Sequence, residues 1–350
     1  MRKMLSLVVP VYFEEECIAQ FISEVRPVLE SLPLDFEIVF IDDGSADRTC
    51  AIIREYAYDD ERIKLLEFSY NHGKQAAVSA GIRFARGDYL LYIDPDLQDP
   101  PEEIPRFVST IEEGYDLVFG VRREKKDSFI NTTLSKTFWF ILEKFTGLSI
   151  PRGLAVMRIF TRRFADQFLL YGEQNRFIEG IFMHIGMKRT TLVIGQRERF
   201  AGVSKFNFRK KLKLAFDAIL DFSELPLRMA VRLGLSLSLL GFIAISVVLV
   251  LKLTVVNFQA GWPSLIGVLV MGFGVQLFFI GIAALYIGKI YNETKRRPLY
   301  SIREATNISL GAALPASRFA TEGSREPAVL PPAASPAPTT SGGRRSALST

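Results

Sequence analysis

Two long apolar segments, residues 233–256 and 264–288, constrain the fold of this 350-residue chain more than any other feature. The first contains a single charged residue, Lys252 near its end, and the second contains none. A helix rises about 1.5 Å per residue, so roughly 20 apolar residues cross a hydrocarbon core about 30 Å thick. Uninterrupted apolar runs of this length are more typical of membrane spans than of buried core helices. We therefore predict a hairpin of two transmembrane helices.

Basic residues flank this hairpin on both sides. Arg228 and Arg232 precede it, Lys289 and the run 295–297 follow it, and the seven residues at its tip, 257–263, carry no charge. Because cytoplasmic flanks are enriched in Lys and Arg, both flanks are expected in the cytoplasm. The N-terminal apolar run is too short for a signal peptide, so the N-terminal part is expected there as well.

Three further segments border the hairpin. Residues 206–232 are predicted to form amphipathic juxtamembrane helices, with Phe208, Leu212 and Phe216 on one face and lysines elsewhere. Such a cationic helix suits the headgroup plane, although an ordinary solvated surface helix has the same pattern. Residues 289–306 are expected to be a cytoplasmic segment. Residues 307–350 are rich in Ala, Pro, Ser, Thr and Gly, which predicts a disordered tail.

The N-terminal part, residues 1–205, is predicted to be a catalytic domain of the α/β class. Its first 125 residues alternate between strand-like and helix-like patterns. Strands are expected at 5–11, 37–41, 63–68, 89–93 and 116–120, and helices at 17–32, 47–58 and 74–85. Such a βαβ series predicts a mostly parallel sheet covered by helices, with ligands bound at the carboxyl ends of the strands.

Acidic residues follow two of these strands. Asp94, Asp96 and Gln98 come directly after the strand at 89–93. Two carboxylates two residues apart can share a hard divalent cation, and that cation can bridge a diphosphate. Surface turns are also rich in Asp, so the spacing alone is weak evidence. The oxygen donors favour Mg²⁺ or Mn²⁺ over zinc.

A second acidic cluster follows the strand at 37–41, in the sequence DDGSADRT. Ser45 or Asp47 is suited to cap the helix that runs to Tyr58. That interpretation leaves Asp42 and Asp43 unexplained, and carboxylates there can accept hydrogen bonds from a base edge or a ribose hydroxyl. The loop after the first strand adds an aromatic residue, Tyr12, which is able to stack on a base.

Composition narrows the partners. A net charge of +5 and a pI of about 9.1 indicate an anionic partner such as a membrane surface, a nucleotide or a nucleic acid. Cys17 and Cys50 are too few and too far apart for a disulfide scaffold or a thiolate metal site. The two histidines, His72 and His184, are interpreted as loop-packing residues rather than bases.

The motifs PVYFEE, DDGSADRT, NHGKQAAVSAG, DPDLQDPPE and RFAGVSK, followed by two spans, resemble the family 2 inverting glycosyltransferases of GT-A fold. The closer resemblance is to the polyisoprenyl-phosphate branch, and it covers residues 5–300. The sequence departs from that pattern at Phe13, Pro95, Asn131, Gly153 and His184. These departures bear on the donor and on phosphate contacts more than on the reaction class.

The resemblance implies roles for individual residues. The residues implied for the nucleotide and its sugar are Pro10, Tyr12, Glu14, Asp43, Asp94 and Pro95. Asp96 and Gln98 would hold the Mg²⁺ or Mn²⁺, and Arg122 would bind phosphate or sugar. Arg199, Ser204 and Lys205 would meet the donor and acceptor phosphates near the membrane. The residues implied as catalytic are Asp96, Arg122, Arg199 and Lys205.

The function implied by the resemblance is transfer of a sugar, with inversion, from a UDP-sugar such as UDP-glucose to polyprenyl (undecaprenyl) phosphate. The reaction would occur at the cytoplasmic face of the cell inner membrane, in cell-envelope biosynthesis. A homo-oligomer and a downstream flippase are expected, and nucleic acid is not. Two alternatives remain: a glycolipid or polysaccharide synthase that uses a hydroxyl acceptor, and a catalytically silent membrane scaffold.

Overall fold

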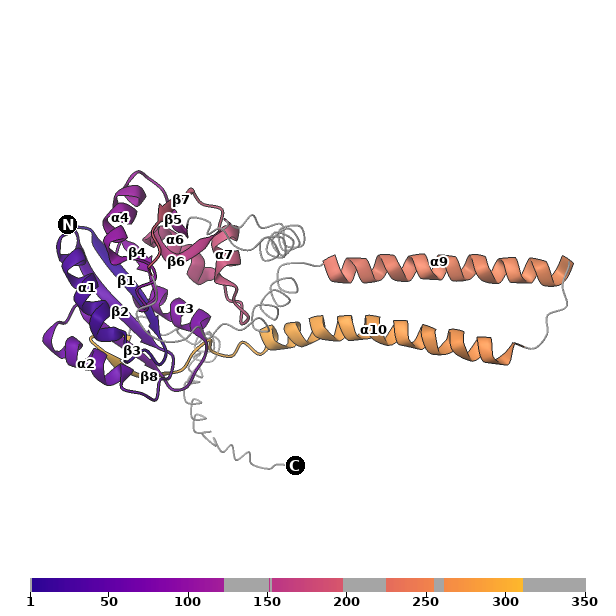
Figure 1. The fold of residues 1–350 in the computed structure, drawn as a ribbon. Coiled ribbons are helices and arrows are strands. Elements are labelled where there is room, and N and C mark those ends of the chain that lie inside the picture. The colour runs from indigo at the N-terminus through magenta and orange to yellow at the C-terminus, as the bar shows by residue number, and fades with distance from the viewer. Residues whose placement is uncertain (1, 123–150, 152, 198–224, 255–260, 311–350) are drawn as a thin grey trace, which may run out of the picture. The chain divides into compact units, whose positions relative to one another are not determined.

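A computed structural model describes residues 2–122, 151, 153–197, 225–254 and 261–310, and Figure 1 shows its elements along the chain. The strands are β1 (Met4–Val11), β2 (Asp35–Asp42), β3 (Ile63–Phe68), β4 (Tyr89–Tyr92), β5 (Leu117–Arg122), β6 (Leu154–Thr161), β7 (Arg189–Ile194) and β8 (Ile302–Thr306). The helices are α1 (Ile18–Glu30), α2 (Thr49–Asp59), α3 (Lys74–Phe84), the 3₁₀ turn η1 (Pro101–Glu103), α4 (Ile104–Glu112), α6 (Arg162–Leu170), α7 (Ile178–His184), α9 (Leu225–Thr254) and α10 (Trp262–Thr294).

The strands form one mixed sheet in the order β7–β5–β6–β4–β1–β2–β3–β8. The central run β3–β2–β1–β4 is parallel throughout, and β5 pairs with β7 in parallel. Strands β6 and β8 run antiparallel to their neighbours. The prediction of a mostly parallel α/β sheet is confirmed, as are the strands and helices expected before residue 122.

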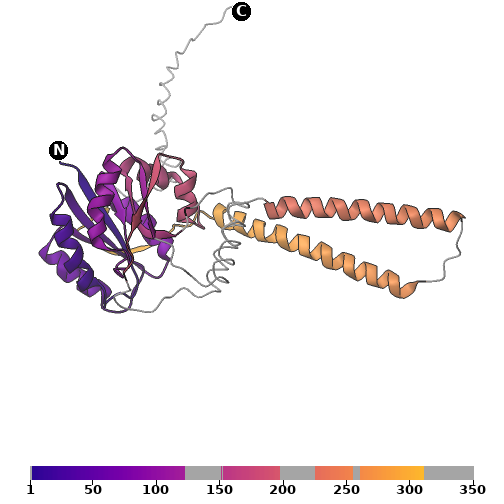
Figure 2. The same cartoon turned by 45° about the horizontal axis from the view of Figure 1, so that its top comes forward.

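Helices cover both faces of the sheet, as Figures 1 and 2 show. Alternation along β1 explains the two layers, because successive side chains of a strand point to opposite faces. Leu5 and Leu7 belong to the core shared with α1, α2 and α4. Val8 faces α3 on the other side. A Cβ on Gly81 of α3 would lie 2.4 Å from Val8 Cγ1, so only glycine allows this close approach.

The order of the parallel strands reverses at β1. From β1 the chain builds β2 and β3 on one side, and β4 then pairs with the opposite edge of β1. In open α/β sheets this reversal leaves a crevice outside the carboxyl ends of the two strands, and ligands bind there. The topology therefore places the ligand crevice beyond Val11 and Tyr92.

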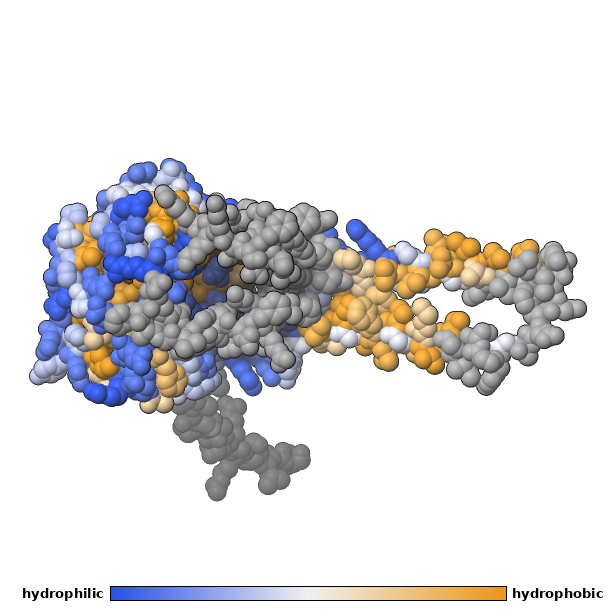
Figure 3. All heavy atoms as spheres, in the orientation of Figure 1, coloured by the Kyte–Doolittle hydropathy of each residue, from blue (hydrophilic) through white to orange (hydrophobic). Residues whose placement is uncertain are grey.

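Helices α9 and α10 contain the two apolar segments. Both are long and apolar enough to cross a membrane, over Leu227–Ala244 and Val268–Thr294. Their described apolar side chains are largely exposed, and Figure 3 shows these side chains gathered over both helices while the visible sheet domain is mostly hydrophilic. Of the predicted juxtamembrane segment 206–232, residues 206–224 lie outside the described residues, and residues 225–232 are the first part of α9. The tail beyond 310 also lies outside the described residues.

Strand β8 lies within the segment 289–306, for which no strand was expected. It pairs antiparallel with β3, with Leu65 opposite Thr306 and Phe68 opposite Ile302. The side-chain amide of Asn307, the first residue of the predicted tail, donates to the carbonyls of Ala57 and Ile63 at 2.8 and 2.9 Å. The chain is therefore attached to the sheet through this residue.

Candidate active site

A pocket of about 490 Å³ opens at the predicted crevice. Loops that follow β1, β2, β3 and β4 contribute to it, as do β5 and β6 from the antiparallel side. Its lining residues are Pro10, Val11, Tyr12, Glu14, Asp43, Asn71, Gly73, Lys74, Ala77, Asp94, Pro95, Asp96, Gln98, Arg122, Leu154 and Val156.

The structure brings together every candidate site residue that it describes. All nine of them line this one pocket: Pro10, Tyr12, Glu14, Asp43, Asp94, Pro95, Asp96, Gln98 and Arg122. They come from four strand ends spread over more than 100 residues of sequence, so their meeting is a product of the topology. Arg199, Ser204 and Lys205 lie outside the described residues, and their roles stay predictions.

The loop after β1 is held by the turn after β2. Asp42 accepts hydrogen bonds from the backbone N–H groups of Gly44 and Ser45, at 3.1 and 2.9 Å. Ser45 Oγ in turn accepts from Phe13 N at 3.0 Å, and Thr49 Oγ1 accepts from Glu14 N at 3.0 Å. Asp42 and Ser45 therefore shape the pocket wall.

Of the two residues suited to cap α2, Ser45 is used instead by the neighbouring loop, where its hydroxyl accepts from Phe13 N. Residue Arg48 occupies the cap position and makes no side-chain capping bond. Asp47, the other candidate, accepts from Thr49 N at 3.1 Å. Of the two residues in the capping pattern, Asp47 therefore bonds the first residue of α2 and Ser45 bonds the loop after β1.

Asp43 organises the loop after β3. Its carboxylate accepts from His72 N at 2.7 Å, from Gly73 N at 2.9 and 3.1 Å, and from Asn71 Nδ2 at 3.0 Å. Burial nevertheless raises the pKa of Asp43, since these bonds only partly offset its desolvation. This carboxylate is thus one that the protein keeps in the pocket at an energetic cost.

The loop after β4 places Asp96 and Gln98 beside each other. Asp96 Oδ1 accepts from Gln98 N at 3.2 Å, and Gln98 O accepts from Arg197 N at 3.0 Å. Leu97 between them has φ of 57°, a left-handed conformation that is uncommon for residues other than glycine. Backbone strain of this kind is concentrated at functional sites.

Lys74, which sequence reasoning did not single out, forms an ion pair with Asp94. Its Nζ lies 2.6 Å from Asp94 Oδ2. Desolvation alone would lower the pKa of Lys74, but Tyr92 and the Asp94 carboxylate raise it above its ordinary value. The NHGK motif was the available signal, since Gly73 with φ of 92° turns the chain into α3 and leaves Lys74 at its first position.

Asp99 is a second residue that the sequence analysis missed. It is 3% exposed, and its carboxylate accepts from Arg122 Nη2 at 2.7 Å and from Met157 N at 2.8 Å. Asp99 therefore orients Arg122 at the pocket edge. Gly153 completes this corner: its φ is 69°, its carbonyl accepts from Arg122 N, and a Cβ there would lie 2.9 Å from Arg122 O.

The donor set suits Mg²⁺ or Mn²⁺. Within the described residues no group of three His, Cys, Asp or Glu side chains is placed to hold a metal by itself. Mg²⁺ typically binds through one or two protein oxygens, with substrate phosphates and water completing its shell. Asp96 and Gln98 fit that mode. Neither histidine lines the pocket, and burial together with the nearby Glu14 raises the pKa of Cys17 to about 11, so a thiolate ligand is disfavoured.

The mostly parallel sheet, its strand reversal and the Asp94-Pro95-Asp96 motif at the end of β4 define a glycosyltransferase domain of GT-A type. The glycosyl transferase family 2 model matches residues 6–171, and the chain belongs to that family. Among solved structures, mannosyl-3-phosphoglycerate synthase from Rubrobacter xylanophilus superposes with a TM-score of 0.45 at 16% identity, covering 66% of this chain and 75% of that one.

The relatives match most of this chain and nearly all of their own length. The uncharacterized glycosyltransferase YkcC of Bacillus subtilis is 36% identical over 87% of this chain and 94% of its own. The SfII prophage-derived bactoprenol glucosyl transferase of Shigella flexneri is 37% identical over 86% and 98%. The undecaprenyl-phosphate 4-deoxy-4-formamido-L-arabinose transferase of Proteus mirabilis is 33% identical over 87% and 94%.

Proposed function

We propose that this glycosyltransferase moves a sugar, with inversion, from a nucleotide sugar to polyprenyl phosphate at the cytoplasmic face of a membrane. UDP-glucose is the first donor to test and undecaprenyl phosphate the first acceptor. The observation that carries the proposal is the pocket itself, where Asp94, Asp96 and Gln98 face the same space as Arg122. That combination suits a metal-bound diphosphate next to a reacting sugar.

The relatives support the acceptor. Two of them are named for bactoprenol and undecaprenyl phosphate. The match to the bactoprenol glucosyl transferase extends over 303 residues of this chain. The residues of this chain outside that match are fewer than those of α9 and α10 together, so the match includes part of these helices. Two long apolar helices in the same chain as the glycosyltransferase domain fit an acceptor that resides in a membrane.

In the proposed reaction an oxygen of the lipid phosphate attacks the anomeric carbon from the face opposite the nucleoside diphosphate. A C–O bond forms to the lipid phosphate, and the bond to the nucleoside diphosphate breaks with its electron pair. The phosphate is already ionised near pH 7, so no side chain has to remove a proton. A reaction without a general base agrees with the lining of the pocket, which includes no histidine.

In this reaction the protein would position the nucleotide sugar and neutralise the negative charge of the leaving diphosphate. Tyr12, Glu14 and Asp43 would hold the nucleotide, and Arg122, oriented by Asp99, would stabilise the leaving diphosphate. A divalent cation held by Asp96 and Gln98 would offset the charge that develops there. Arg199, Ser204 and Lys205 would contact the phosphates on the membrane side.

The test is a transfer assay with the purified full chain in detergent. Labelled UDP-glucose and other common nucleotide sugars are incubated with polyprenyl phosphate and Mg²⁺ or Mn²⁺, with polyprenol as the matched acceptor lacking the phosphate. We expect a labelled product with the phosphate alone. Transfer to polyprenol would favour a hydroxyl acceptor, and no transfer from any donor would contradict the proposal.

A further inference from the structure

The chain returns from the second apolar helix to the sheet domain as strand β8. It leaves α10 at Thr294 and pairs with β3 from Ile302 onward. Ion pairs flank the strand: Arg303 Nη2 lies 2.6 Å from the buried Glu67, and Glu304 contacts Arg54 at 3.2 Å. The returning segment is therefore docked on the edge of the sheet along the length of β8.

The beginning of this segment contacts the loop after β3. Ser301 N donates to His72 Nε2 at 3.1 Å, and Ser301 O accepts from Ser69 N at 2.9 Å. The ring of Tyr300 stacks on Phe68, with centroids 5.0 Å apart and planes inclined by 5°. His72 packs between Phe68 and Tyr70, which confirms its interpretation as a loop-packing residue.

The same loop lines the donor pocket on its other side. His72 N and Gly73 N donate to Asp43, while Asn71 and Gly73 belong to the lining. Gly44 packs directly against the backbone of this loop, because a Cβ at that position would lie 2.7 Å from the carbonyl carbon of Tyr70. The Tyr70–Gly73 loop is thus held between the turn after β2 and the segment that returns from α10.

We propose that the side chain of Tyr300 and the backbone of Ser301 position the loop that lines the donor pocket. Ser301 N–H donates to His72, and Tyr300 stacks on Phe68, against which the His72 ring packs. Together they keep the backbone N–H groups of the loop aimed at Asp43. The identity of the ligand as a nucleotide rests on the proposed function. The consequence is that donor affinity depends on the docking of a segment that follows the apolar hairpin, although this segment contributes no residue to the pocket lining.

The far end of β8 provides an internal control. Asn307 donates to the carbonyls of Ala57, near the end of α2, and of Ile63, the first residue of β3, and neither residue lines the pocket. A variant there loosens the same strand without touching the loop. A purely structural role of β8 predicts equal effects at its two ends, whereas a positioning role of Tyr300 predicts an effect on binding at one end only.

The experiment measures binding of UDP and of GDP, each with Mg²⁺, to the full chain in detergent by calorimetry. For Tyr300→Ala we expect the Kd of the bound nucleotide to rise roughly fivefold to tenfold, as for loss of an aromatic stack and the hydrogen bond it supports. Tyr300→Phe keeps the ring and should bind within about twofold of wild type. Asn307→Ala should lower the thermal unfolding midpoint and leave the Kd within about twofold.

A second pair of variants tests the contact between His72 and the returning segment without changing Tyr300. His72→Ala removes the acceptor of Ser301 N–H and should raise the Kd about threefold to fivefold. Ser301→Ala keeps both backbone groups and should bind as wild type does. In the transfer assay, Tyr300→Ala and His72→Ala should raise the KM for the donor more than they lower kcat.

The outcomes separate the two hypotheses. If wild type binds a nucleotide and both Tyr300→Ala and His72→Ala bind it with an unchanged Kd, the positioning role is overturned and the proposed function stays intact. An equal rise of Kd in Asn307→Ala also overturns it, since strand stability would then explain the effect. If Tyr300→Ala does not fold, His72→Ala decides. Wild type that binds neither nucleotide contradicts the proposed function, and the inference with it.

Discussion

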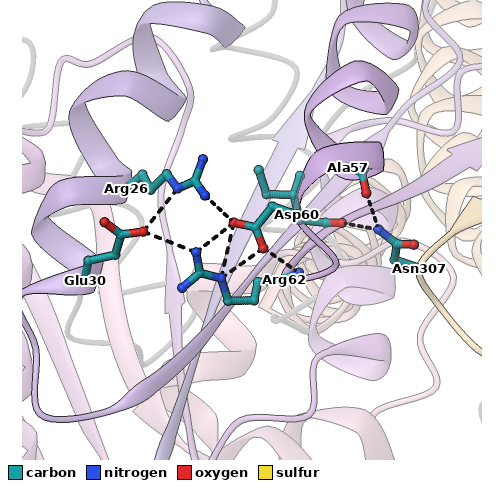
Figure 4. Close-up of polar contacts among 7 residues, drawn as sticks. Arg26, Glu30, Ala57, Asp60, Arg62 and Asn307 are labelled. Atoms are coloured by element: carbon teal, nitrogen blue, oxygen red, sulfur yellow. Dashed lines mark hydrogen bonds and ion pairs between the residues drawn. The ribbon is translucent and has the colours of Figure 1, made fainter.

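The two ends of the central parallel strands carry similar charged residues but use them differently. At the amino end, Asp60 accepts from Arg62 Nε and Arg26 Nη2, both at 2.9 Å, and Glu30 joins the two arginines (Figure 4). At the carboxyl end, the carboxylates line a pocket about 490 Å³ in volume. At the amino end the charges are paired within the protein, whereas at the carboxyl end paired charges such as Lys74 and Asp94 also line the pocket.

The pKa directions express this difference. Hydrogen bonds from Arg62 lower the pKa of Asp60 against the opposing effect of burial, so its ionised form stabilises the fold. Burial raises the pKa of Asp43, so its ionised form costs the fold stability. The comparison teaches that an ionised Asp60 adds stability at the amino end, whereas an ionised Asp43 at the pocket reduces it.

The largest expected effect is at the carboxyl end. Asp96→Ala should reduce sugar transfer at least about 100-fold, because it removes the carboxylate proposed to hold the charge-neutralising cation. The thermal unfolding midpoint should change little, since the desolvation cost of the carboxylate is removed as well. The measurement is the transfer assay together with a thermal melt, with Asp60→Asn as the control. Full activity in Asp96→Ala would contradict the assigned metal role.

At the amino end, Asp60→Asn should cost about 1–3 kcal/mol of unfolding free energy and leave the donor KM unchanged. The pKa of Asp60 is lowered in the folded state, so its contribution is complete above the ordinary value of about 3.9 and fades as pH falls through the lowered value. Melts of wild type and variant should therefore begin to converge as the pH falls below about 4, and should coincide below the lowered pKa of Asp60. A difference that persists at low pH would show that the ion pair is not its source.

Asp99→Asn sharpens the boundary between the two ends. Asp99 is buried as Asp60 is, but its partner Arg122 lines the pocket. We expect transfer to fall about tenfold, or ~1.4 kcal/mol in activation free energy, because Arg122 loses its orientation. Asparagine can still accept from Met157 N, so the melt should shift less than in Asp60→Asn. A loss of stability without a loss of transfer would place Asp99 with the structural pairs.

Local patterns predicted much of the fold and of the pocket. The strand ending at Tyr92 and the helix beginning at Lys74 follow from periodicity, and nine predicted site residues line one pocket because parallel strands end at the same edge. Patterns did not predict the partners of these residues. Lys74 and Asp94 are 20 residues apart, and Asp99, in the loop after β4, is 23 residues from Arg122 at the end of β5.

Strand β8 shows the same limit at longer range. Its five residues, IREAT, are largely polar, and Arg303 meets Glu67 from 236 positions away. A short edge strand of this kind has no periodic signal strong enough to be recognised by itself. Its pairing with β3 depends on the position at which α10 ends, and a short stretch of sequence does not contain that information.

The sequence by itself determined the apolar hairpin, the alternation of strands and helices, and the acidic residues at strand ends. Each of these depends on neighbours in the chain, through segment length or side-chain period. Only the tertiary structure decided which carboxylates meet a guanidinium and which face the pocket. It also decided that Tyr300 and Ser301 reach the donor loop, because such contacts depend on strand order and on packing between distant segments.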